Sequence, residues 1–200
     1  PAVLIDFKLP VTDSVSVMAG FLGRNVISRP EGGSQIFASY SGMVRWQPSD
    51  AIDLRLFNAT FYTLDREGRA TYLPAGDQLP AKVPRGEFLG LDWTEFDQKT
   101  MVNGAIAHID LGDRLRLDAG LFDTKDTIDK AFGDFLLGVT SDGRVADRLV
   151  IASANNSDRS LSGEARLVRE WNTGHLAHRL IASVRGRSRD RPVGGSSRML

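Results

Sequence analysis

The sequence predicts an all-β protein, an antiparallel up-and-down meander of about 8–10 long strands that forms part of a transmembrane β-barrel. Three observations predict this fold. Runs in which apolar and polar residues alternate recur along the 200 residues, with the period of two at which strand side chains change face. Several runs exceed the ~5 to 6 residues usual for strands of soluble proteins. Short turns and longer loops also tend to alternate between the runs, as in outer-membrane barrels.

The first four runs are the clearest. A turn at Pro10–Asp13 separates the first two, a loop at Arg24–Gly33 follows the second, and a tight turn at Pro48–Asp50 follows the third. Proline, glycine and aspartate at these places are typical turn residues. The expected strands are Val3–Leu9, Val15–Leu22, Ser34–Gln47 and Ile52–Tyr62.

A long loop is expected from about Thr63 to Trp93. It contains Pro74, Pro80 and Pro84, and prolines this close together exclude a long regular element. A loop of this length inside one domain is usually functional.

The middle of the chain should add two strands joined at Gly112-Asp113, Phe96–Leu111 and Arg114–Phe122, followed by a polar loop at Asp123–Lys130. Beyond it, Phe132–Thr140 and Val145–Ala154 could pair through a turn containing Asp142-Gly143, because Asp-Gly readily supplies positive φ angles. The alternative is one long loop carrying a small hairpin or a short helix. A short link, Asn155–Asp158, leads to the last hairpin.

The last hairpin, Ser160–Arg191, has a short polar turn at Asn172–Gly174. Each arm is long enough to cross a bilayer as a tilted strand, which takes about 9 to 11 residues. If short turns are periplasmic, the second arm climbs outward from His175, and Trp46 and Trp171 mark an interfacial aromatic girdle. The expected lipid face comprises Leu161, Ala165, Leu167, Leu180, Ala182 and Val184.

Composition excludes several classes of protein. The 25 Lys and Arg balance 25 Asp and Glu, so no net field attracts nucleic acid. The absence of cysteine excludes disulfides, thiol catalysis and thiolate metal sites. No uninterrupted apolar run approaches the ~20 residues of a membrane-spanning helix. The chain starts at Pro1 with no signal-peptide pattern, and we expect it to be a segment of a longer mature protein.

Several phrases resemble the early barrel strands of TonB-dependent outer-membrane receptors of the iron-siderophore uptake type. They are LPVTDSVSVMAGF, FASYSGMVRWQPSDAIDLRLFNATFYT, LRLDAGLFDTKD and SLSGEARLVREWNTGHLAHRLIASVRGRSRD. The resemblance implies that residues 1–200 are a partial barrel, roughly the first ten of about 22 strands. The family's plug domain, through which TonB couples to the inner membrane, and its C-terminal strands are absent from this segment.

Three arginines in the second arm of the last hairpin, Arg185, Arg187 and Arg189, are the sharpest candidate ligand site. Facing inward near the extracellular rim, they would attract an anionic ferric chelate. The alternative is a structural ladder paired with carboxylates such as Glu164 and Glu170. A nucleic-acid arm is disfavoured, because the segment lacks interleaved aromatics and a basic domain behind it.

Tyr72 and Trp93 are the candidate ligand contacts in the long loop, unless these aromatics pack the loop onto itself. No metal site, cofactor or catalytic motif is expected: His175 and His178 would point to opposite faces of a strand, and no hydrolase, phosphate-loop or zinc-protease signature occurs.

Three functions fit these observations. The first is a receptor in the bacterial outer membrane that captures a ferric siderophore or similar small chelate for TonB-driven import, without enzymatic activity. The second is a passive porin or adhesion barrel without TonB coupling. The third is a soluble β-sandwich binding module.

Overall fold

The computed structural model describes residues 1–27, 33–80, 82, 86–153, 156–192 and 196–199. The described residues form strands, turns and loops, and they include no helix long and apolar enough to cross a membrane. Residues 28–32 of the loop expected at Arg24–Gly33, residues 81 and 83–85 of the long loop, and residues 154 and 155, which adjoin the last hairpin, lie outside the described part.

Eleven strands form one hydrogen-bonded sheet within the described residues. They are β1 (Ala2–Pro10), β2 (Val15–Ile27), β3 (Ser34–Ser49), β4 (Ile52–Glu67), β5 (Ala70–Pro74), β6 (Glu95–Gly112), β7 (Leu115–Val139), β8 (Asp147–Ser153), β9 (Asn156–Thr173), β10 (Leu176–Asp190) and β11 (Ser196–Met199).

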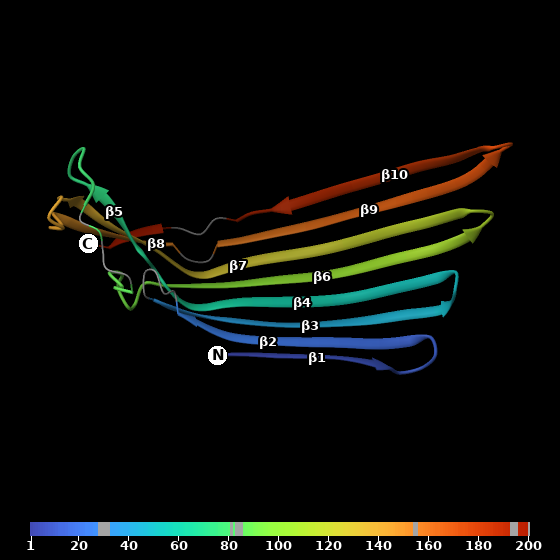
Figure 1. The fold of residues 1–200 in the computed structure, drawn as a ribbon, viewed down its shortest axis with the longest axis horizontal. Coiled ribbons are helices and arrows are strands. Elements are labelled where there is room, and N and C mark those ends of the chain that lie inside the picture. The colour runs from blue at the N-terminus through green and yellow to red at the C-terminus, as the bar shows by residue number, and fades with distance from the viewer. Residues whose placement is uncertain (28–32, 81, 83–85, 154–155, 193–195, 200) are drawn as a thin grey trace.

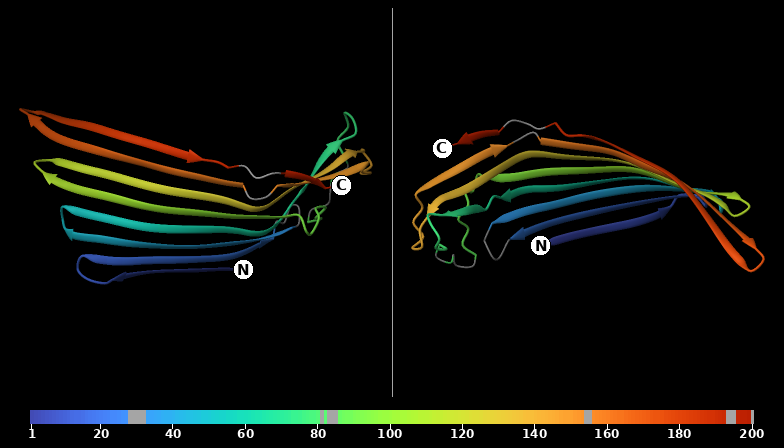
Figure 2. Two further views of the ribbon diagram at one scale, coloured as in Figure 1. Left: turned by 180° about the vertical axis from the view of Figure 1, so that it is seen from behind. Right: turned by 90° about the horizontal axis from the view of Figure 1, so that it is seen from above.

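The main sheet is an antiparallel meander, in which β1, β2, β3, β4, β6, β7, β9 and β10 lie side by side in that order. Four tight turns, β1–β2, β3–β4, β6–β7 and β9–β10, gather at one end, while the longer connections lie at the other (Figure 1). The sheet is curved and open (Figure 2). This architecture confirms the predicted fold class.

A second group of strands lies at the loop end (Figure 1). The final part of β7 pairs with β8 and, in parallel, with β5, and β11 pairs with β8. We call these strands the cap sheet. Leu136, Val139 and Val150, which are three of the four buried hydrophobic side chains among the described residues, belong to it. Most of the buried apolar side chains thus lie in the cap sheet, and the main sheet, which is a single layer, contributes Val168.

The last hairpin folds as predicted. Its two arms are β9 and β10, paired from Thr173 opposite Leu176 to Arg159 opposite Asp190. The six side chains expected on one face do share it, because pairs such as Ala165–Val184 and Leu167–Ala182 stand opposite each other in the register. Trp46 and Trp171 both lie beside tight turns, as expected, and both are exposed.

The loop predicted at Asp123–Lys130 is wrong. These residues belong to β7, a single strand that also contains the predicted sixth and seventh strands. The segment pairs with β6 and β9 on its two sides, and Asp126 accepts hydrogen bonds from Gln98 and Thr100 across β6. A strand with two polar faces has no hydrophobic alternation, so its sequence reads as a loop.

The continuity of β7 also corrects the position of one short turn. The predicted hairpin at Phe132–Ala154 exists, and Gly143 has the positive φ of 87° that its turn requires. Because β7 does not reverse before it, this turn lies at the loop end rather than with the other tight turns (Figure 1).

Other predicted boundaries need extension. β2 continues to Ile27 and β4 to Glu67, into segments expected as loops. The long loop also contains β5, a five-residue strand ending at Pro74. Its parallel pairing with β7 departs from the expected antiparallel meander. Pro74 lies at the last position, where the missing amide hydrogen interrupts least pairing.

The main sheet has an apolar face and a charged face. Register places Val44, Leu56, Ala105 and Leu121 in one row of the apolar face. Two residues further toward the loop end, this face becomes polar: Asn58 donates a 2.7 Å hydrogen bond to Asn103, and Arg159 pairs with Asp123. The apolar surface therefore forms a belt that ends below these polar pairs.

Candidate functional site

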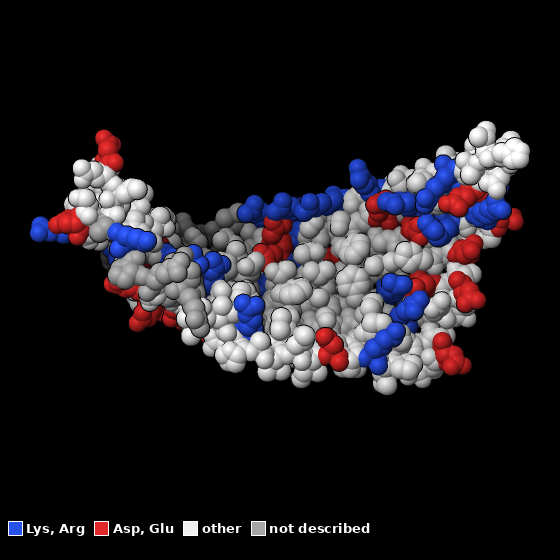
Figure 3. All heavy atoms as spheres, in the orientation of Figure 1, with Lys and Arg blue, Asp and Glu red and all other residues white. Residues whose placement is uncertain are grey.

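The arginine row lies at the loop end of β10, on the charged face of the main sheet. Arg189 Nε donates to Asp158 Oδ1 at 2.8 Å, and Arg187 Nε donates to Ser160 Oγ at 2.8 Å, both on β9. Arg191 approaches Asp158 at 3.9 Å. Figure 3 shows the basic side chains as a continuous band along this edge of the sheet.

Arg185 and Arg187 line a hollow of about 450 Å³ on the charged face. Phe122 supplies an aromatic wall, and Glu164 supplies a carboxylate that accepts a 2.7 Å hydrogen bond from Arg166. Two guanidinium groups beside one aromatic ring provide donors and a flat apolar surface together. This arrangement can receive a small anionic ligand that carries aromatic rings.

The carboxylates expected to oppose the row have other partners. Glu164 binds Arg166 on its own strand, and Glu170 lies 3.4 Å from Arg179 near the tight turn. The ion pair within the row uses Asp158 instead. Spacing along one strand could not reveal this pairing, because it depends on the register between strands.

A separate charged cluster lies at the tight-turn end of the same face. Asp53 on β4 accepts two hydrogen bonds from Arg45, at 3.0 and 2.9 Å, and two more from Arg55. Nearby, Asp118 binds His108 at 2.8 Å and Arg116 at 3.1 Å. Arg45 and Arg55 each hold Asp53 in a two-point contact, which is typical of structural ion pairs.

Tyr72 and Trp93 lie apart from the arginine row in sequence and in strand pairing, at the cap sheet. Tyr72 is on β5, opposite Leu136 of β7, and partial burial together with the negative charge of Glu87 raises the pKa of its phenol. Trp93 packs edge-on against Phe132 with ring centroids 5.6 Å apart, yet is 51% exposed. Trp93 thus belongs to residues 86–94 of the long loop, and Tyr72 lies near Glu87 of the same segment.

A buried ion pair holds that loop to the cap sheet. Arg148 of β8 donates from Nε to Asp134 Oδ1 at 2.8 Å and from Nη2 to the carbonyl of Leu89 at 3.1 Å. The Asp134 side chain is 0% exposed, and its carboxylate raises the pKa of Arg148. No pattern in the sequence marks this pair, because its partners lie on two strands whose pairing brings them together.

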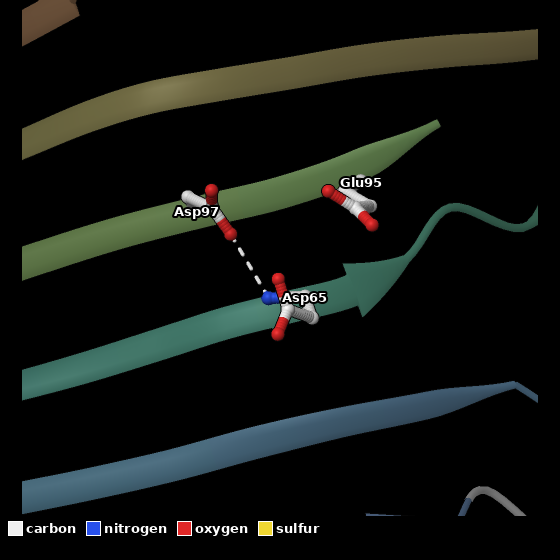
Figure 4. A group of neighbouring side chains, drawn as sticks. All are labelled: Asp65, Glu95 and Asp97. Carbon is white, nitrogen blue, oxygen red and sulfur yellow. Dashed lines mark hydrogen bonds between the residues drawn. The ribbon is translucent and has the colours of Figure 1, made fainter. Parts of the chain in front are cut away.

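Three carboxylates meet where β4 and β6 approach the loop end: Asp65, Glu95 and Asp97 (Figure 4). Their oxygens lie within 4.8 Å of one another. Lys130 Nζ lies 3.0 Å from Glu95 and 3.2 Å from Asp97, and these carboxylates raise the pKa of Lys130. Lys130 is thus the cationic partner of this cluster. It lies in the segment Asp123–Lys130, which the sequence predicted to be a loop.

Comparison with known proteins gives a match at the level of structure. No protein-family profile matches the chain, and no curated protein matches its sequence. The crystal structure of the siderophore receptor PiuA from Acinetobacter baumannii is similar, with a TM-score of 0.69 over 98% of this chain at 12% sequence identity. This chain spans 30% of that receptor's chain. The similarity identifies the open, antiparallel sheet as part of a β-barrel fold.

Proposed function

We propose that the chain is the N-terminal part of the barrel wall of a bacterial outer-membrane receptor that imports a ferric siderophore or similar small chelate. In this proposal the remaining barrel strands and a plug domain belong to the same protein, and TonB drives import through the plug. The chain takes part by capturing the ligand and carries no catalytic activity. The single observation that carries the proposal is the structural similarity to a siderophore receptor over 98% of the chain.

The two faces of the main sheet support a membrane location. On β6 the apolar belt runs from Leu111 to the polar Asn103, eight residue steps of ~3.4 Å, or about 27 Å along the strand. At the ~35 to 45° tilt of barrel strands this length covers about 19 to 22 Å of the membrane normal, slightly less than the apolar band about 25 Å tall of outer-membrane barrels. Trp46 and Trp171 at the tight-turn end would anchor the belt at one membrane interface.

The charged face supports an anionic ligand. Arg185 and Arg187 line a hollow with Phe122 at the level of the Leu121 row of the apolar belt, and Arg189 continues the arginine row toward the loop end, which would lie on the extracellular side. The two arginines outnumber the one carboxylate of the lining, Glu164, and a surface with an excess of one sign of charge attracts the opposite sign. We therefore infer a preference for an anionic chelate with aromatic iron-binding groups, such as a ferric tris-catecholate, over a neutral ferric trihydroxamate.

Iron uptake by cells that express the complete reading frame tests the proposal. We expect uptake of radioactive iron presented as the tris-catecholate, and loss of this uptake when TonB is deleted. Uptake that persists without TonB would support a passive porin instead. A protein that remains in the soluble fraction would overturn the membrane location.

The double variant Arg185→Ala/Arg187→Ala tests the arginine row. Because hydrogen bonds to charged groups contribute about 1.5 to 3 kcal/mol each, we expect at least about tenfold weaker tris-catecholate binding. Arg179→Ala is the matched control, because Arg179 lies on the same strand at the tight-turn end. Equal losses in both variants would contradict a role for the row in ligand binding.

A further inference from the structure

We propose that Arg148 is a positioning residue that locks residues 86–94 onto the cap sheet and thereby holds Trp93 ready for ligand contact. The proposal rests on the ligand capture inferred above. Arg148 does not itself need to contact the ligand. Its role is to keep residues 86–94 of the long loop in one fixed position.

Residues 86–94 rest on one face of the cap sheet. In the cap sheet, Arg148 stands opposite Leu136, Asp134 stands opposite Val150, and Tyr72 stands opposite Leu136 on the other side. Side chains of directly opposed residues share a face. Asp134, Leu136 and Val150 are all buried, so this face is the covered side of the cap sheet.

Arg148 joins the loop to the cap sheet through hydrogen bonds. Two of its nitrogens bind the carboxylate of Asp134, whose side chain is 0% exposed, and one of them also donates to the Leu89 carbonyl. If Arg148 moved away, a buried charge would lose its partner, which is strongly unfavourable. The guanidinium is therefore fixed, and the backbone at Leu89 is fixed with it.

A second set of hydrogen bonds holds the loop directly after Trp93. The amide of Gly68 donates to the Thr94 carbonyl at 2.7 Å, and Thr94 is fully buried and bonds back to the Leu91 carbonyl. Trp93 thus lies between two anchored points. Its ring makes a T-shaped contact with that of Phe132 at an interplanar angle of 82°, which orients the indole while half of Trp93 stays exposed.

Fixing the loop before binding has an energetic consequence. A ligand that contacts an already ordered aromatic side chain does not bear the cost of ordering the loop. Loss of the clamp should therefore weaken binding even though Arg148 itself makes no ligand contact. The effect must also depend on Trp93, because Trp93 is the group that the clamp positions.

The test uses the full-length protein in detergent, with the ferric tris-catecholate as probe. We expect Arg148→Ala to increase amide hydrogen exchange in residues 86–94 and to weaken probe binding about tenfold. Arg144→Ala is the matched control: Arg144 is an exposed arginine of the neighbouring turn, paired with Asp142, and its removal should change neither quantity.

A double-mutant cycle with Trp93→Ala separates positioning from general destabilisation. We expect Arg148→Ala to cost no further affinity once Trp93 is removed. Additive losses would overturn the proposal, and so would unchanged binding by Arg148→Ala despite faster exchange. If the unmutated protein does not bind the probe, the proposed function fails, and exchange in residues 86–94 still decides whether Arg148 holds the loop.

Discussion

Gly90 has no room for a side chain. A Cβ atom there would lie 2.2 Å from the Gly68 carbonyl oxygen and 2.3 Å from the ring of Phe88. The backbone of the loop can approach the link between β4 and β5 this closely only because residues 68 and 90 are both glycine. Side-chain size at two residues thus decides how the loop seats on the cap sheet.

Gly90→Ala is therefore expected to displace the loop. Overpacking of this kind costs about 1 to 3 kcal/mol, and it should appear as faster proteolysis of residues 86–94. Gly76→Ala is the control, because a Cβ atom at Gly76 meets nothing within 4 Å. Equal proteolysis rates in the two variants would contradict the close approach.

Asp134→Ala should destabilise the cap sheet by about 1 to 3 kcal/mol, because it removes the charged hydrogen-bond partner of Arg148, whose side chain is only partly exposed to water. The expected result is faster hydrogen exchange in residues 131–153, while exchange in β2 and β3 stays unchanged. Asp142→Ala, which breaks an exposed pair with Arg144, should have almost no effect. Comparable changes in both variants would argue against a buried clamp.

At the scale of strands, β7 shows that the surroundings of a strand decide whether apolar and polar residues alternate along it. Its first part alternates strictly, with Leu117 and Leu121 on the apolar face and Asp118 on the charged face. Beyond Asp123 both faces are polar, and the alternation ends while the hydrogen bonding to β6 and β9 continues. Strand pairing therefore extends past the apolar belt.

Ala119→Arg tests the apolar face as a lipid surface. Ala119 stands opposite Ala107, midway between Leu111 and Asn103 on the apolar belt. An arginine near the bilayer midplane costs about 2 to 4 kcal/mol in an outer-membrane barrel, and we expect this loss in the unfolding free energy measured in lipid vesicles. Ser41→Arg is the control, because register places Ser41 on the charged face between Gly20 and Ala59. Tolerance of both substitutions would contradict a membrane wall.

Lys130→Met tests the partner of the three carboxylates. Lys130 has a raised pKa, so its pairing is fully present at neutral pH and is lost only as pH rises above the ordinary lysine range of about 10.4. In the variant the unpartnered carboxylates repel one another. Hydrogen exchange at residues 95–98 should then be faster in the variant than in the unmutated protein at pH 7, and equal rates in the two proteins would contradict this role.

At the scale of the whole molecule, the main sheet has two outer strands, β1 and β10, each paired on one side within the described residues. One face of β1 is apolar and exposed, with Val3, Ile5 and Phe7 each more than half exposed. Long apolar edges pair with other chains unless they are covered, and lipid does not tolerate unpaired backbone. Further strands of the same barrel would satisfy both edges.

We therefore expect residues 1–200 alone to self-associate in detergent, whereas the complete reading frame should give a monomeric barrel by light scattering. Ile5→Lys should reduce the association of the isolated segment, since a charge on an edge strand disfavours pairing. Asp6→Lys, on the opposite side of the same strand, is the control for the lysine itself, because position 6 already carries a charge. A monodisperse, unassociated segment would contradict the open edges.

The sequence by itself determined the strands of the apolar belt and their faces, including the last hairpin, the tight turns beside Trp46 and Trp171, and the all-β class. It could do so because a belt with one apolar and one polar surface imposes alternation on each strand that crosses it. The candidate arginines were also visible, since they share one face of β10.

Only the tertiary structure decided the rest. The polar half of β7, the parallel β5, the Asp134–Arg148 clamp and the meeting of Lys130 with its carboxylates all depend on strands far apart in the chain. Outside the belt both faces of a strand can be polar, so no period marks the strand, and only the register between strands determines which side chains meet.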